Sequence, residues 1–194
     1  MTTTPDQPIT LLKRDILAEN QVYQVCFDHI RTAQGHEVPN FLSVVPHTLT
    51  ADRLGGVAVL PIAQGRIGLL KVWRHPLGCF GWEIPRGFID ANETAEVAAL
   101  RELQEEMGIQ ASADALQPLG TFAPEAALLQ ARVALFAVHL DECAGAVSDE
   151  AGHSELRWFP AAEFIALLAN GDIEDAATNI AWLRVLLSLT PPGE

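Results

Sequence analysis

The chain has 194 residues, 49% of them hydrophobic, and a formal net charge of −13 at pH 7. This length suits one domain, or one domain with an extension, and is enough to bury a substantial core. The negative charge disfavours a nucleic-acid partner, because phosphate backbones are bound by clustered Lys and Arg. The apolar runs are of strand length, as at residues 133–138, so we expect no membrane partner either.

The three cysteines, Cys26, Cys79 and Cys143, lie far apart and form no CxxC pair. Their spacing predicts neither a disulfide framework nor a zinc site, and favours small core residues in a reducing compartment. Residues 1–15 have no apolar core like that of a signal peptide. Both observations favour a cytoplasmic localisation.

Strand-like segments come first along the chain. Residues 22–30 and 41–45 have strand patterns, with a turn at residues 33–36 between them. We interpret residues 1–48 as a small antiparallel β extension and residues 49–194 as the main domain. In the main domain, residues 56–61 and 67–73 are predicted to form a hairpin around Gln64-Gly65.

A helix is predicted from Ala95 to Met107, since this segment consists almost entirely of good helix formers. Thr94 is placed to cap its first turn, and Gly108 to end it in the left-handed conformation. Leu100, Leu103 and Met107 share one face, which we expect to be buried.

The remaining elements are strands at residues 119–122, 132–140 and 156–159 and helices at residues 160–169 and 175–189. Strands interleaved with a few helices, without regular βαβ repetition, predict an α/β or α+β sandwich.

Three carboxylates gather on a second face of the predicted helix. Glu102, Glu105 and Glu106 fall at i, i+3 and i+4. A like-charge pair at about 4 Å costs roughly 1 kcal/mol in water and about 4 kcal/mol at an effective dielectric of 20. A hard divalent cation would relieve this repulsion, because Mg²⁺ takes oxygen ligands. Arg101 is four residues before Glu105 and can orient a carboxylate. A solvated acidic face is the alternative.

Residues 87–109 (GFIDANETAEVAALRELQEEMGI) follow the pattern G-x5-E-x7-R-E-(aliphatic)-x-E-E-x-G-(aliphatic) without departure. The segment resembles the motif of the Nudix hydrolases, metal-dependent enzymes that cleave a diphosphate linked to another moiety. The resemblance implies an α/β fold, the Nudix α/β/α sandwich with a mixed sheet. It also implies Mg²⁺ or Mn²⁺ held by Glu102, Glu106, Glu105 and the carbonyl of Arg86.

The flanks resemble the ADP-ribose pyrophosphatases within that family. Residues 82–87 (WEIPRG) are similar to their WE-(L/I)-P-x-G segment, Pro124 lies fifteen residues after Ile109, and residues 171–178 resemble G-x-I-x-D-x-x-T. The resemblance implies hydrolysis of ADP-ribose to AMP and ribose 5-phosphate, and a homodimer formed through the β extension. Arg86 departs from the alanine common at its position, which leaves the sugar-side specificity open.

Several residues are candidates for roles around the diphosphate. Glu150 and Glu155, in the loop before residues 156–159, are near-equal candidates for the general base, with solvated loop acids as the alternative. His153 in the same loop is expected to be a surface residue. Arg74 and Glu83 are candidates for substrate binding, as is the Arg86 side chain.

An aromatic platform for adenine is expected from the extension. Phe27 is the leading candidate, with Tyr23 and Phe41 as alternatives, although core packing is the usual role of such residues.

Two other functions stay open. The chain could hydrolyse another nucleotide, such as a nucleotide sugar or an oxidised nucleoside triphosphate. It could also be a non-catalytic nucleotide-binding module, because a fold alone does not fix function. The complete set of motif carboxylates favours an enzyme acting on a small nucleotide.

Overall fold

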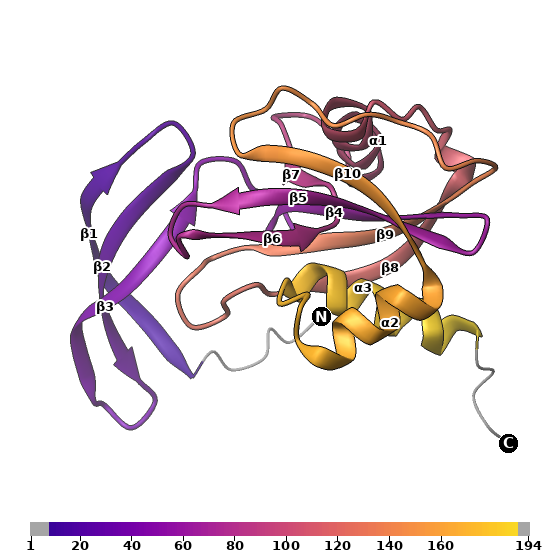
Figure 1. The fold of residues 1–194 in the computed structure, drawn as a ribbon. Helices are drawn as coiled ribbons and strands as arrows, with labels where there is room; N and C mark the ends of the chain where they lie inside the picture. Colours follow the sequence, from indigo (N-terminus) through magenta and orange to yellow (C-terminus); the bar gives the residue numbers. More distant parts are fainter. Residues whose placement is uncertain (1–7, 190–194) are drawn as a thin grey trace, which may run out of the picture.

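The computed structural model describes residues 8–189 and forms two β-sheets (Figure 1). A three-stranded sheet stands beside a larger seven-stranded sheet, which carries helices on both faces. The extension and main domain expected from the sequence correspond to these two sheets, and residue 48 falls in the loop between them. The domain boundary at residue 48 stays a prediction. The first residues of the predicted extension, 1–7, and the last residues of the predicted main domain, 190–194, lie outside the described residues.

The small sheet is antiparallel and follows the chain order β1 (Ile9–Glu19), β2 (Tyr23–Thr32) and β3 (Glu37–Pro46). The sequence located β2 and β3 but not β1. Register shifts between Leu11 and Lys13 and between Ile16 and Ala18 interrupt β1. Because each shift reverses the side-chain alternation, β1 lacks the two-residue periodicity by which a strand is recognised.

The large sheet has the order β10-β5-β4-β9-β8, with β6 paired to β5 and β7 paired to β4. The β4–β9 pair is parallel and the other pairs are antiparallel, so the sheet is mixed. Its strands are β4 (Leu54–Ala63), β5 (Arg66–Arg74), β6 (Cys79–Glu83), β7 (Arg86–Phe88), β8 (Leu116–Phe122), β9 (Arg132–Leu140) and β10 (His153–Pro160).

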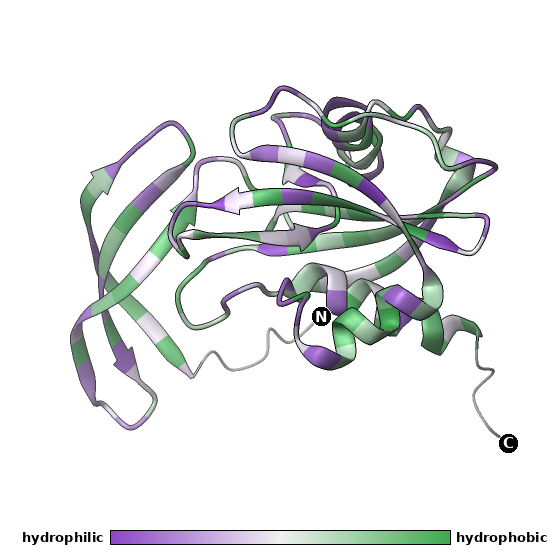
Figure 2. Ribbon diagram, viewed as in Figure 1, coloured by the Kyte–Doolittle hydropathy of each residue, from purple (hydrophilic) through white to green (hydrophobic). Residues whose placement is uncertain are grey.

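Two hydrophobic cores cover the two faces of this sheet. On β4, Val57 and Val59 pack in the core that contains α1 (Ala95–Met107), whereas Ala58 and Leu60 pack in the core that contains α2 (Ala161–Asn170) and α3 (Ala176–Leu189). Hydrophobic residues accordingly dominate the central strands (Figure 2). A strand buried on both faces reads as a continuous apolar run. The predicted α/β/α sandwich with a mixed sheet is confirmed.

Helix α1 begins and ends where the sequence predicts. The Thr94 hydroxyl accepts a hydrogen bond from the Val97 N–H, and Gly108 has the left-handed φ of 66°. Its buried face differs from the expected one, because Leu100 is only half-buried. Glu102 and Glu106 are buried beside Leu103 and Met107, since this face of α1 packs against β4 and β7.

Among residues 8–189, no helix has the length and hydrophobicity needed to cross a bilayer.

Candidate active site

A cavity of about 710 Å³ lies between α1, β4, β7 and the loop that precedes β10. Glu102, Glu105 and Glu106 form one part of its wall, and Tyr23, the first residue of β2, forms another part. Arg74, Arg86, Arg101, Glu150 and His153 also line it. Much of the polar chemistry predicted from the sequence therefore meets in one place.

Glu102 is seated against the chain at Gly87. A Cβ on Gly87 would lie 1.9 Å from Glu102 Oε1, far inside contact distance, so only glycine allows this close approach. The same oxygen accepts a hydrogen bond of 2.7 Å from Arg101 Nη1. Burial raises the pKa of the Glu102 carboxyl.

Arg101 joins the helix to the loop that precedes it. Its guanidinium donates to both oxygens of Glu93 at 3.0 Å, to the Phe88 carbonyl at 2.8 Å and to Glu105 at 3.0 Å. Glu93 also accepts from the Asp90 N–H. The fixed spacing of Glu93, Arg101 and Glu102 thus has a structural cause, because one guanidinium holds both carboxylates.

Glu106 is the most deeply buried carboxylate of the helix, at 5% exposure. Its Oε2 accepts a hydrogen bond of 2.8 Å from the Arg86 N–H. Burial, followed by the charges of Glu150 and Glu102, raises the pKa of Glu106 to about 8. A cation placed among these carboxylates would favour their ionised forms, since opposite charge offsets the cost of burial.

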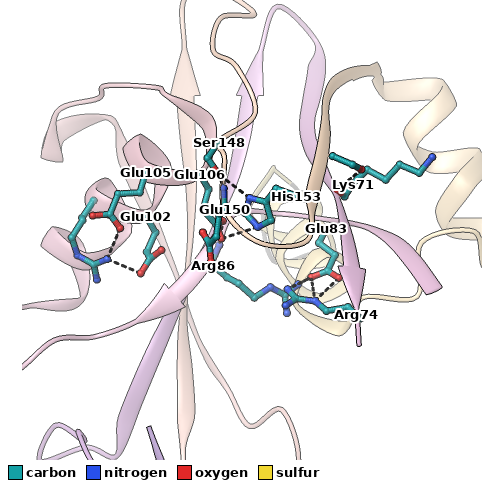
Figure 3. A network of polar contacts seen from close by, with 12 residues as sticks. Lys71, Arg74, Glu83, Arg86, Glu102, Glu105, Glu106, Ser148, Glu150 and His153 are labelled. Atoms are coloured by element: carbon teal, nitrogen blue, oxygen red, sulfur yellow. Dashed lines mark hydrogen bonds and ion pairs between the residues drawn. The ribbon is translucent and has the colours of Figure 1, made fainter. Parts of the chain in front are cut away.

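The loop before β10 and the first residue of β10 place Glu150 and His153 beside Glu106 (Figure 3). His153 is not a surface residue as predicted, because its side chain is only 4% exposed. Its Nε2 lies 3.4 Å from Glu106 Oε1, and its Nδ1 lies 3.0 Å from Ser148 Oγ. One ligand atom from each of Glu106, Glu150 and His153 falls within 4.8 Å of the other two.

A second polar network joins the cavity to the start of α3. Arg74 donates to both oxygens of Glu83, and Arg86 Nη2 lies 3.0 Å from Glu83 and 2.5 Å from Asp175. Burial opposes ionisation of Asp175, yet Arg86 and Thr178 hold its pKa below the usual value. The contacts of Arg86 are ion pairs of poor hydrogen-bond geometry, and its buried Nε and Nη2 have no hydrogen-bond partner among the described residues.

Asp175 and Thr178 also fix the backbone of the segment that carries Arg86. Thr178 donates its hydroxyl to Asp175 and accepts from the Ile84 N–H at 3.1 Å. This gives the G-x-I-x-D-x-x-T segment a structural role that its sequence did not reveal.

Four predicted residues lie outside the cavity wall, and one of them, Glu83, lines a neighbouring pocket together with Arg74 and Arg86. Glu155 is an exposed residue of β10 opposite Lys71, and Phe27 is a half-buried residue of β2. Phe41 lines a separate cavity beneath the small sheet. Tyr23 reaches the wall and meets Phe88 edge to face, with ring centroids 5.7 Å apart. No local signal in the sequence distinguished His153 from an ordinary loop histidine.

Comparison with known proteins agrees with this geometry. Residues 52–183 match the family model of the NUDIX domain. The chain belongs to the Nudix family. With every carboxylate of the motif present, it is a Nudix pyrophosphohydrolase.

Among similar proteins, the ADP-ribose pyrophosphatase of Mycobacterium tuberculosis is 36% identical over 141 residues, which are 69% of this chain and 66% of the relative. The CMP-5'-(N-acetyl-N-hydroxy-3-aminopropyl)phosphonate hydrolase of Streptomyces rubellomurinus is 28% identical over 152 residues, 77% of this chain and 71% of the relative.

A solved structure described as "Crystal structure of ADP compounds hydrolase" matches with a TM-score of 0.76, covering 94% of this chain and 95% of that one. At 20% sequence identity this match supports the fold alone. The predicted resemblance to Nudix hydrolases near the ADP-ribose pyrophosphatases is confirmed.

Proposed function

We propose that this Nudix enzyme hydrolyses ADP-ribose to AMP and ribose 5-phosphate with Mg²⁺ or Mn²⁺. The observation that carries the proposal is the pair Glu102 and Glu106, buried against Gly87 and the Arg86 N–H at the wall of one cavity. Buried carboxylates are retained where they are paired or bind a cation. The similarity to an ADP-ribose pyrophosphatase supports the choice of substrate.

The donor set fits a hard divalent cation, because every helix ligand is a carboxylate oxygen and Glu105 adds one at the solvent side. Glu102, Glu105, Glu106 and the Arg86 carbonyl would hold it. When bound, the metal supplies charge neutralisation at the diphosphate and lowers the pKa of a bound water. Arg101 orients Glu102 and Glu105, so we assign it a positioning role.

Glu150 is the proposed general base. It lines the cavity close enough for its charge to act on Glu102 and Glu106, whereas Glu155 lies outside the wall. A base must come within hydrogen-bond reach of the attacking water. Glu150→Gln should therefore lower kcat by about 100-fold or more, and Glu155→Gln by less than about threefold. The reverse order would transfer the role to Glu155.

Arg86 and Arg74 are proposed to bind the diphosphate. Both arginines line the cavity, and Glu83 and Asp175 ion-pair with them. Glu83 holds the two arginines in place. We assign the aromatic platform for adenine to Tyr23, since it lies in the wall and Phe27 does not.

A homodimer formed through the three-stranded sheet is part of the proposal. The sheet exposes large apolar side chains that a second copy could bury, on β1 and β3: Ile9, Leu11, Leu12, Ile16, Leu17, Val38, Phe41 and Leu42. Exposed apolar patches of this kind mark interaction sites. We also propose a cytoplasmic location, consistent with the free cysteines Cys26, Cys79 and Cys143. A mass equal to that of the monomer, measured by light scattering on the intact protein, would contradict the dimer.

The deciding experiment is a product-resolved hydrolysis screen with Mg²⁺ over ADP-ribose, nucleotide sugars, dinucleotides and nucleoside triphosphates. We expect kcat/KM for ADP-ribose to exceed that for GDP-mannose and dATP at least tenfold, about 1.4 kcal/mol of differential stabilisation. The streptomycete relative favours a second candidate, a cytidine nucleotide linked to a phosphonate, and the screen should include one. Equal turnover of triphosphates would overturn the choice of ADP-ribose.

A further inference from the structure

His153, the first residue of β10, is held in a fixed orientation by the loop that precedes the strand. Ser148 Oγ lies 3.0 Å from His153 Nδ1 and also accepts the Glu150 N–H at 3.4 Å. The His153 N–H donates to the Glu150 carbonyl at 3.0 Å. These hydrogen bonds link Ser148, Glu150 and His153 to one another, so the Glu150 and His153 side chains are held on the same side of the cavity wall.

The loop is also tied to the elements on either side of the cavity. Ser148 N–H donates to the main-chain carbonyl of Glu106 at 3.2 Å, and Trp73 N–H donates to the Gly152 carbonyl at 2.8 Å. Gly152 has a φ of +100°, which glycine adopts without strain. The imidazole therefore points at the end of α1 through backbone contacts on both sides (Figure 3).

The Nε2 atom of His153 faces Glu106 without a good hydrogen bond. Their separation of 3.4 Å is long for a charge-assisted hydrogen bond, which is about 2.7–2.9 Å. If Nδ1–H donates to Ser148 Oγ, then Nε2 carries a lone pair directed at a carboxylate oxygen. In that tautomer Nε2 can ligate a cation that the Glu106 carboxylate also binds.

The spacing of the group suits such an ion. The ligand atoms of Glu106, Glu150 and His153 lie within 4.8 Å of one another. Two ligands of one ion with bonds of about 2.1 Å lie roughly 3.0 Å apart when adjacent and roughly 4.2 Å apart when opposite. The 3.4 Å between His153 Nε2 and Glu106 Oε1 falls within this range.

We infer that Glu106 and His153 hold one metal ion in a mixed nitrogen and oxygen site, in which the His153 imidazole is a direct ligand and Glu150, the proposed base, lies beside the ion. The inference rests on the proposed metal-dependent function and specifies its metal preference. Imidazole suits transition metals, whereas Mg²⁺ prefers oxygen ligands. The enzyme should therefore bind Mn²⁺, Co²⁺ or Zn²⁺ in preference to Mg²⁺ at this site, and Ser148 is a positioning residue for the ligand.

The test is pulsed electron paramagnetic resonance of Mn²⁺ bound to the full chain. The wild-type protein is prepared with natural histidine and with histidine labelled by nitrogen-15 in the ring. We expect the coupling of a directly bound imidazole nitrogen, changed by the label. In His153→Gln the coupling should disappear, and in His139→Gln it should persist, because His139 is exposed and contacts Gln117 instead.

Calorimetry on the same proteins gives the metal preference. His153→Gln should weaken Mn²⁺ binding by at least about tenfold and Mg²⁺ binding by less than about threefold, since glutamine offers only an oxygen ligand. Mn²⁺ binding without an imidazole coupling in the wild-type protein, or with one that survives His153→Gln, would overturn the histidine ligand and leave the proposed function intact. A folded protein that binds no divalent cation would overturn both.

Discussion

Gly87→Ala is the substitution that most directly tests the close packing of the Glu102 carboxylate against Gly87. The added Cβ would lie 1.9 Å from Glu102 Oε1, 2.0 Å from its Cδ and 2.4 Å from its Oε2. The φ of Gly87 is not in the left-handed region, so alanine meets no backbone strain there. The three atoms nearest to the added methyl group all belong to the Glu102 carboxylate, so the methyl group acts chiefly by displacing it.

The expected effect is large on catalysis and small on stability. A non-bonded carbon and oxygen need about 3.3 Å, so the carboxylate must move by more than about 1 Å. Misplacement of a catalytic group by 1 Å costs about 100-fold in rate. Because the carboxylate ends a flexible side chain, the overpacking cost should stay near the lower end of the usual range of about 1–3 kcal/mol.

Steady-state hydrolysis and thermal unfolding measure the two effects. Gly81→Ala is the matched control, since its Cβ would meet only Glu83 Oε1 at an ordinary 3.6 Å. We expect kcat of Gly87→Ala to fall at least about 100-fold while Gly81→Ala stays near wild type. A Gly87→Ala enzyme within about threefold of wild-type kcat would refute the close seating of Glu102 as the reason for this glycine.

Three further substitutions probe other parts of the chain. Glu106→Gln should lower kcat by about 100-fold or more without lowering Tm, because it removes a charge from the site yet keeps an acceptor; near-normal turnover at normal Tm would contradict the metal assignment. Thr94→Ala removes the hydroxyl that accepts from Val97 and should cost about 1 kcal/mol in urea unfolding. Asp28→Asn should cost about 1–3 kcal/mol at pH 7, because it breaks the ion pair with Arg14. The Arg14 hydrogen bonds hold the pKa of Asp28 below its unfolded value, so this difference is complete above about pH 4 and should shrink as the pH falls further.

The fold was predictable wherever a pattern is local. The strands β4, β5 and β9 and the helix α1 were expected close to their observed bounds, because apolar runs and helix caps act within a few residues. The short strands β6 and β7 were not expected. Each exists because it pairs with a neighbour, β5 or β4, and a few residues carry no periodicity of their own.

The sequence predicted which carboxylates of the helix line the site, but not which residues of the helix are buried. The motif spacing indicated that Glu102, Glu105 and Glu106 share one face of the helix, and all three line the cavity. Leu100 was expected in the buried face and is only half-buried, while Glu102 and Glu106 are buried. Helical periodicity gives the relative angle of side chains but not which angle faces the sheet.

The sequence by itself determined the family, the layered fold and the carboxylates of α1, because these depend on residues a few positions apart. Only the tertiary structure decided that Glu150 rather than Glu155 lines the cavity, and that His153 is buried against Glu106. These placements arise where β10 pairs with β5 and its loop bonds to the end of α1. Contacts between segments far apart in the chain leave no local pattern, so the chemistry of the loop emerges only when the sheet has formed.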